Sequence, residues 1–193
     1  MTVLAPCRAV LALALVTAMA GARAQAPADL VLVPRQVSPH GWFFQGEAGM
    51  ASVANRGFMA NAGFVVTTDG VVVFDTLGTP ALGRALLAAI ARVTPQPVRR
   101  VVVSHYHADH FYGLQPVKAA GGEVWAHRDA RRYLESPQAA ERLAQRRAEL
   151  SPWIDDRMVI VAPDVWIDGD TSFRMGGLSF RVVHAGAAHA PED

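Results

Sequence analysis

The decisive stretch of this sequence is Ser104-His105-Tyr106-His107-Ala108-Asp109-His110, which directly follows the apolar residues 101–103. Three imidazoles and one carboxylate therefore stand at the end of a predicted strand. Neutral imidazoles and carboxylates bind zinc at about 2.0–2.2 Å, and the HxHxDH spacing can turn its ligands toward two neighbouring points. Burying these groups together without a cation would carry a large desolvation cost. The stretch is interpreted as a two-metal site, with the candidate ligands His105, His107, Asp109 and His110.

Length and composition restrict the class of protein. The chain has 193 residues, 51% of them hydrophobic and 18% charged, and its formal net charge is +1. These values predict one globular domain with a sizeable core and argue against disorder. A charge this close to zero gives no electrostatic reason to expect a nucleic-acid partner.

Residues 1–24 are interpreted as a cleaved export signal. Arg8 precedes the apolar residues 9–20, and Ala22-Arg23-Ala24 is a small-residue cleavage pattern. An apolar run of about twelve residues is shorter than the roughly twenty that span a bilayer, so no membrane anchor is expected after cleavage. The mature chain would be periplasmic or secreted. Cys7, the only cysteine, would leave with the signal, which excludes disulfides and thiolate ligands from residues 25–193.

Hydrophobic patterns in the first half of the mature chain predict alternating strands and helices. Two β-branched runs joined by Asp69-Gly70 predict a hairpin. Thr79-Pro80, followed by apolar residues at helical spacing, predicts a helix that ends before Thr94-Pro95. The predicted strands cover residues 40–44, 63–68, 71–75, 99–103 and 123–127, and the helices residues 80–93 and 114–120. This alternation is typical of a layered α/β domain.

The second half is helical in character over residues 128–150, with a break at Ser136-Pro137. Short antiparallel strands are then predicted at residues 159–161, 173–175 and 178–184. A solvated helix face explains the basic cluster in the helical part, and a lip that attracts anionic substrates is the alternative. This cluster consists of Arg142, Arg146 and Arg147. Trp153 is either a wall of a binding pocket or an ordinary core or surface residue.

Together these residues resemble the metallo-β-lactamase-fold hydrolases. The resemblance is carried by Phe74-Asp75-Thr76, by the HxHxDH run, and by Gly186-Ala187-Ala188-His189-Ala190-Pro191-Glu192-Asp193. It covers nearly all of residues 25–193, and its central motif is highly specific. The sequence looks most similar to exported metallo-hydrolases, including the zinc metallohydrolases of quinoprotein relay systems. The resemblance implies an αββα sandwich of the α/β class.

The same resemblance implies a set of site residues. His105, His107 and His189 would form a three-histidine first metal site. Asp109 and His110 would begin the second metal site. Asp109 would also position the metal-bound hydroxide and handle its proton, which makes it the candidate catalytic residue.

Other residues are assigned roles behind or outside this site. Asp75 is interpreted as orienting the metal loop or a ligand histidine, and an ordinary turn aspartate is the alternative. His127 and His184 are interpreted as structural or exposed. Full-length family members carry a bridging carboxylate and a last histidine beyond the position of Asp193. The second metal site and the second half of the sandwich are therefore expected to be largely missing from residues 25–193.

The implied activity is zinc-dependent hydrolysis with one or two Zn²⁺ ions. The cations lower the pKa of a bound water, present it as the nucleophile and polarise the substrate carbonyl. The substrate is expected to be a small molecule with an ester, thioester, lactone or amide bond, β-lactams included, because the fold does not fix the substrate. The alternative is a catalytically incompetent metal-binding or accessory domain, or a non-functional fragment of such a hydrolase. The sequence makes no prediction of the oligomeric state.

Overall fold

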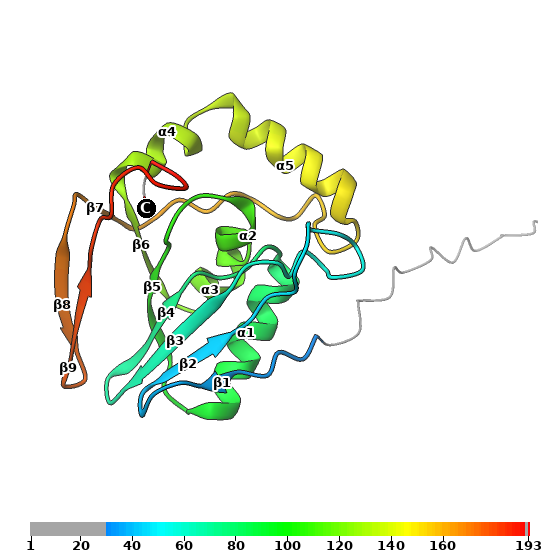
Figure 1. Ribbon diagram of the computed structural model, residues 1–193. Helices are drawn as coiled ribbons and strands as arrows, with labels where there is room; N and C mark the ends of the chain where they lie inside the picture. Colours follow the sequence, from blue (N-terminus) through cyan, green and yellow to red (C-terminus); the bar gives the residue numbers. More distant parts are fainter. Residues whose placement is uncertain (1–29, 192) are drawn as a thin grey trace, which may run out of the picture.

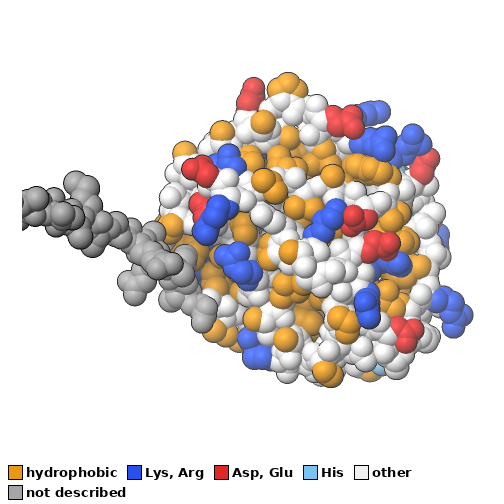
Figure 2. Space-filling view, turned by 180° about the vertical axis from the view of Figure 1, so that it is seen from behind, with side chains coloured by type: hydrophobic (Ala, Val, Ile, Leu, Met, Phe, Trp, Pro, Cys, Tyr) orange, Lys and Arg blue, Asp and Glu red, His pale blue; other side chains and the backbone are white. Residues whose placement is uncertain are grey.

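The computed structural model describes residues 30–191 and 193, so the predicted export signal at residues 1–24, with Cys7, lies outside the described residues. A seven-stranded sheet forms the centre of a mixed α/β structure, as the sequence predicts (Figure 1). Within the described part of the chain, no helix is both long and apolar enough to cross a bilayer. On the face seen in Figure 2, basic, acidic and apolar side chains are interspersed.

The seven strands lie side by side in sequence order. Neighbours from β1 to β4 pair antiparallel, and neighbours from β4 to β7 pair parallel. The strands are β1 (Arg35–Gln36), β2 (Gly41–Phe44), β3 (Ala62–Thr67), β4 (Gly70–Phe74), β5 (Val98–Val102), β6 (Glu123–His127) and β7 (Val165–Ile167). Parallel neighbours need crossover connections, and helices supply most of these crossovers.

Helices occupy most of the chain between β4 and β7. They are α1 (Pro80–Val93), α2 (Ala108–Phe111), α3 (Leu114–Ala119), the 3₁₀ turn η1 (Arg128–Ala130), α4 (Arg131–Leu134) and α5 (Pro137–Leu150). Helices α1 and α3 pack together, α4 lies above the carboxyl end of β6, and α5 runs across the upper right of the view, above α2 (Figure 1). The predicted break at Ser136-Pro137 is confirmed, because α5 begins at Pro137.

The predicted hairpin and first long helix are confirmed. Strands β3 and β4 pair Thr67 with Gly70, so the turn is Thr68-Asp69, one residue earlier than predicted. Gly70 has a φ of +142°, a conformation that glycine adopts at no steric cost. In α1, the Thr79 hydroxyl accepts a hydrogen bond from the Leu82 amide at 3.2 Å, and Pro80 occupies the first turn.

The predicted strand at residues 159–161 is wrong. That segment has no strand pairing, and Val159 is 54% exposed. The next strand is instead β7, which pairs parallel with β6 and was not predicted. Asp164 fixes this pairing because its Oδ2 accepts from the Val124 amide at 2.9 Å, while its Oδ1 lies 2.7 Å from Lys118 Nζ. Residues 159–161 and β7 have similar β-propensity, and only β7 has a partner strand to pair with. Pairing with β6 therefore determines which of the two becomes a strand.

A separate antiparallel hairpin follows, made of β8 (Thr171–Met175) and β9 (Leu178–Val182), as predicted. It packs against the central sheet through Arg100, whose guanidinium lies 3.8 Å from the ring centre of Trp125 and 4.3 Å from that of Phe173. A cavity of about 290 Å³ lies between the hairpin and the sheet. Its walls include Phe74 and Val102 from the sheet and Val182 from the hairpin.

Two glycines set the distance between α1, the end of β4 and the turn that follows α2. A Cβ on Gly83 would lie 2.2 Å from the Gly113 carbonyl oxygen, and a Cβ on Gly113 would lie 1.9 Å from the Thr76 carbonyl oxygen. The Gly113 amide also donates to the Leu77 carbonyl at 2.9 Å. This backbone stack allows α1 to approach the end of α2 more closely than any side chain permits.

Gly83→Ala tests the backbone stack. An alanine at an unconstrained helical position is more favourable than glycine by up to about 1 kcal/mol. Here the added methyl overlaps a carbonyl, so we expect the free energy of unfolding to fall by about 1–3 kcal/mol. Urea denaturation measures this change, with Gln138→Ala, at an exposed position of α5, as the neutral control. A stabilised Gly83→Ala protein would contradict the close approach.

Asp164→Asn tests the β6–β7 connection through pH. Burial alone raises the pKa of Asp164, but the hydrogen bonds from Lys118 and the Val124 amide outweigh it and lower the pKa. A lowered pKa stabilises the fold at neutral pH, and this contribution disappears as the pH falls below about 4. We expect Asp164→Asn to be less stable by up to about 1 kcal/mol at pH 7, and the difference to vanish under acid. Urea unfolding across this pH range, beside exposed Asp156→Asn, measures it; a gap independent of pH would exclude an effect of charge.

Candidate metal centre

The HxHxDH run leaves the end of β5 and enters α2. The Val103 amide donates to the Trp125 carbonyl at 2.9 Å, so the chain stays bound to β6 up to this point. His107 is the extended residue before α2, with φ −85° and ψ 140°. The His110 carbonyl accepts from the Thr76 amide at 2.8 Å, which ties α2 to the end of β4. The run is therefore fixed at both ends by backbone hydrogen bonds.

The structure brings His105, His107 and His189 together. One ligand atom from each ring lies within 4.8 Å of the others, although His189 follows His107 by 82 residues. The ring planes of His105 and His107 meet at 80°, and those of His105 and His189 at 89°. His107 Nδ1 and His189 Nε2 are 2.8 Å apart and share a hydrogen bond. The structure thus places the three residues of the predicted three-histidine site side by side.

His105 carries the observation that favours a cation. Its Nε2 atom is buried and has no hydrogen-bond partner among the described residues, which is costly for a polar group. Burial, with the nearby charges of His110 and His107, lowers the pKa of His105 despite the opposing charges of Asp75 and Asp193. The neutral ring is the form that binds a metal ion. These donors therefore fit a divalent cation.

Asp75 binds three donors at the end of β4. Its Oδ1 accepts from the Ser104 amide at 2.8 Å, and its Oδ2 accepts from the Ser104 hydroxyl at 2.7 Å. His110 Nδ1 lies 2.8 Å from the same Oδ2. Asp75 holds this position with a φ of +58°, a left-handed conformation that aspartate tolerates better than most residues. Asp75 thus contacts both the loop, through Ser104, and a histidine, His110.

Asp109 and His110 lie beside the three-histidine group. Their side chains are 3.5 Å apart, from Asp109 Oδ2 to His110 Nε2, and the ring of His110 is 4.1 Å from that of His105. Burial alone lowers the pKa of His110, but the hydrogen bond and charge of Asp75, with the charges of Asp109 and Asp193, outweigh it and raise the pKa. The pair places an imidazole and a carboxylate next to the first cluster, and its role in a second metal position stays a prediction.

The loop that carries His189 is closed by Asp193, a contact that the sequence analysis missed. The Asp193 carboxylate accepts from the His189 amide at 2.6 Å and from the Ala190 amide at 2.7 Å. Its backbone carbonyl accepts from the Ala185 amide at 2.8 Å. Ser104 was missed as well, although its place directly before the HxHxDH run was a usable signal.

A second group, His127, Asp129 and His184, also lies within 4.8 Å. The two imidazole rings are stacked, with centres 3.9 Å apart and planes 5° from parallel. In-plane lone pairs of parallel rings do not converge on one point. Backbone amides also face both His127 nitrogens, from Asp129 and Gly169 at 3.3 Å each. The interpretation of His127 and His184 as structural or exposed residues stays a prediction.

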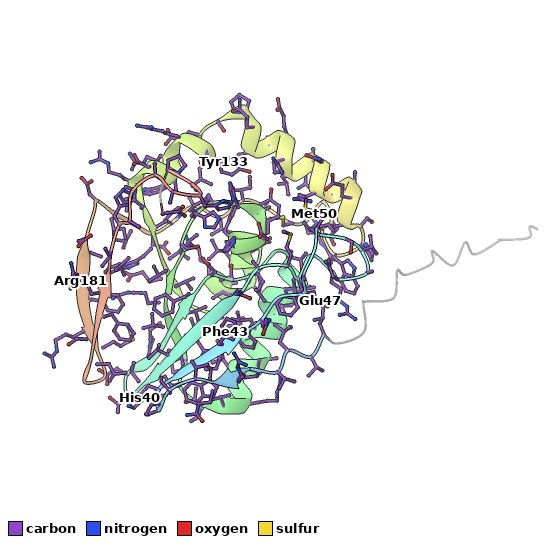
Figure 3. The ribbon with its side chains drawn as sticks, viewed as in Figure 1. His40, Phe43, Glu47, Met50, Tyr133 and Arg181 are labelled. Carbon is purple, nitrogen blue, oxygen red and sulfur yellow. The ribbon has the colours of Figure 1, made fainter. Side chains whose placement is uncertain are left out.

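Arg147, from the basic cluster, and Trp153 donate hydrogen bonds to backbone carbonyls of other segments. Arg147 donates to the carbonyls of Asp155 and Met158, at 3.2 and 2.7 Å. Trp153 Nε1 donates to the Val53 carbonyl at 3.0 Å, which joins the chain after α5 to the loop between β2 and β3. Met50 belongs to the same loop and lies near α5 (Figure 3). Trp153 therefore fastens a loop beside the site.

Comparisons with known proteins agree with this fold. A family model described as the metallo-beta-lactamase superfamily matches residues 55–190. The sec-alkylsulfatase Pisa1 from Pseudomonas sp. is 22% identical, with a TM-score of 0.61; the match covers 84% of this chain and 28% of that one. A metallo-beta-lactamase from Pontibacter korlensis is 23% identical, with a TM-score of 0.60 and coverages of 83% and 64%.

A third structure, the metallo-beta-lactamase MIM-1 from Novosphingobium pentaromativorans, is 22% identical with a TM-score of 0.59. The match covers 85% of this chain and 54% of that one. The chain thus spans less than two thirds of the length of each of these three proteins. Identities this low show a shared fold, and the family model covers most of the described chain. The chain belongs to the metallo-beta-lactamase superfamily.

Proposed function

We propose that this chain carries the metal-binding and catalytic loop of an exported, zinc-dependent hydrolase. The observation that supports it best is the clustering of His105, His107 and His189, together with a buried His105 nitrogen that lacks a partner among the described residues. Three imidazoles with no thiolate suit zinc, which takes nitrogen ligands in tetrahedral sites and keeps one position open for catalysis. When bound, zinc acidifies a coordinated water and polarises a carbonyl.

The protein groups have separate tasks in this proposal. The three histidines hold the cation, and Asp75 keeps the HxHxDH loop and His110 in place through its three hydrogen bonds. Asp109 is 23% exposed, so its carboxylate can reach both a neighbouring water and a substrate. It accepts and returns the proton that moves during hydrolysis. His110 and Asp109 begin a second cation position.

The substrate is proposed to be a small molecule with an ester, thioester, lactone or amide bond. A β-lactam ring is one such amide, and two of the similar structures are called metallo-beta-lactamases. The sec-alkylsulfatase adds sulfate esters to the bonds worth testing. Fold alone does not choose among them, so the assay needs one substrate of each class.

His107→Ala tests the metal centre. Mutating a residue that only supports a ligand typically lowers metal affinity by about 10- to 100-fold. Loss of one of the three ligands should therefore lower zinc affinity by more than about 100-fold and abolish zinc-dependent turnover. Elemental analysis and competition with a chromogenic chelator measure zinc binding, and a panel of the named bonds measures turnover. His40→Ala is the matched control, since His40 is exposed and lies at the opposite end of the sheet (Figure 3).

The outcomes separate the proposed enzyme from its alternative. Stoichiometric zinc with turnover that His107→Ala removes would support the hydrolase. Tight zinc binding without turnover on any substrate class would favour a metal-binding or accessory domain. Absence of stoichiometric zinc from the wild-type chain would overturn the proposal.

Asp109→Asn tests proton transfer separately from binding by the three histidines. The amide keeps the size of the side chain but accepts no proton, so turnover should fall by about 100-fold or more. Zinc binding at His105, His107 and His189 should persist. Steady-state kinetics with elemental analysis measure both quantities, and Asp156→Asn, whose side chain is fully exposed, is the control. Unchanged turnover would remove Asp109 from the catalytic step.

A further inference from the structure

Ser104 lies at a junction between Asp75 and two histidines. Its Oγ atom is 2.7 Å from Asp75 Oδ2 and 3.0 Å from His105 Nδ1. It is also 3.5 Å from His110 Nδ1, but that nitrogen has a closer partner in Asp75 Oδ2 at 2.8 Å. The short contacts of the serine hydroxyl are therefore those with Asp75 and His105.

Counting protons fixes the direction of both contacts. An ionised carboxylate only accepts hydrogen bonds, so the Ser104 hydroxyl donates its single proton to Asp75. The hydroxyl oxygen can then only accept from His105, which requires a proton on His105 Nδ1. In a neutral imidazole the other nitrogen, Nε2, is then bare.

The bare nitrogen is the one that a cation needs. His105 Nε2 is the buried atom without a hydrogen-bond partner among the described residues. In the opposite tautomer it would carry a proton that no described group accepts, and its lone pair would be lost to a metal. The same Asp75 Oδ2 receives His110 Nδ1 directly, so one carboxylate faces the Nδ1 side of both rings.

We propose that Ser104 is a positioning residue that transmits the constraint of Asp75 to His105 and keeps this ring protonated on Nδ1, with Nε2 free for a cation. The inference rests on the proposed function for its purpose, but the tautomer is a property of the metal-free chain. Ser104 is exposed and borders the cavity of about 290 Å³, so water competes for its hydroxyl. If water rather than Ser104 determines the His105 tautomer, the tautomer will not depend on Ser104, and this outcome can be measured.

The test is ¹⁵N NMR of the histidine rings in the metal-free chain, at a pH where His105 is neutral. Protonated and bare ring nitrogens resonate at widely separated shifts, and His105→Gln assigns the signals. We expect the wild type to carry its proton on Nδ1. Ser104→Ala should move the His105 population toward Nε2 protonation, and Ser104→Thr, which keeps the hydroxyl, should restore the wild-type pattern. Ser172→Ala, at an exposed position of β8, is the matched control.

Zinc titration gives a second readout. Ser104→Ala should lower zinc affinity by about 10- to 100-fold, and Ser104→Thr should recover most of it. A wild-type ring protonated on Nε2 would overturn the proposal even if no variant folded. A folded Ser104→Ala protein with unchanged ring shifts would overturn it as well.

The tautomer measurement does not depend on hydrolysis. In one outcome, the wild type is protonated on Nδ1, loses this proton preference in Ser104→Ala, and turns over no substrate. This result would reject the proposed enzyme but support the positioning role of Ser104. Zinc-dependent turnover, together with a His105 tautomer that does not change in Ser104→Ala, would reject the positioning role of Ser104 but support the proposed enzyme.

Discussion

The carboxylate of Asp75 is the interaction on which the candidate site depends. It gathers the amide and hydroxyl of Ser104 and the ring of His110, so the end of β4 and the loop after β5 behave as one unit. The strands that carry these residues are parallel neighbours, and their carboxyl ends necessarily meet at one edge of the sheet. A left-handed backbone at Asp75 directs the chain toward α1 while the side chain stays at that edge.

Backbone contacts supply the rigidity that the side chains need. The stack of Gly83, Gly113 and Thr76 holds α1 against the exit of α2 without any intervening side chain. Asp193 does the same for the loop of His189 by binding two consecutive amides. The imidazoles thus extend from two segments, the HxHxDH run and the His189 loop, whose main chains are already constrained, a requirement for sites in which small displacements are costly.

Local signals predicted those parts of the structure that depend on local chemistry. The Thr79-Pro80 start of α1 and the HxHxDH run are determined by neighbouring residues, and both were identified from sequence. Residues 159–161 were predicted wrongly and β7 was missed, because pairing with β6 and the contacts of Asp164 decide which short run becomes a strand. His189 was assigned only through a family resemblance. Its approach to His107 is a tertiary contact, and the roles of Ser104 and Asp193 depend on side-chain directions that no spacing encodes.

The contact between His107 and His189 has a topological consequence. The two rings are separated by 82 residues, and the segment between them contains β6, β7 and the whole β8–β9 hairpin. Any ion that bridges them acts as a reversible staple across that length. In the chain-entropy description, a permanent link across such a loop lowers the conformational entropy of the unfolded ensemble, which raises its free energy by about 4.5 kcal/mol. The cation would thus stabilise the folded chain, and its removal would lower the stability of the β8–β9 hairpin as well as that of the histidine cluster.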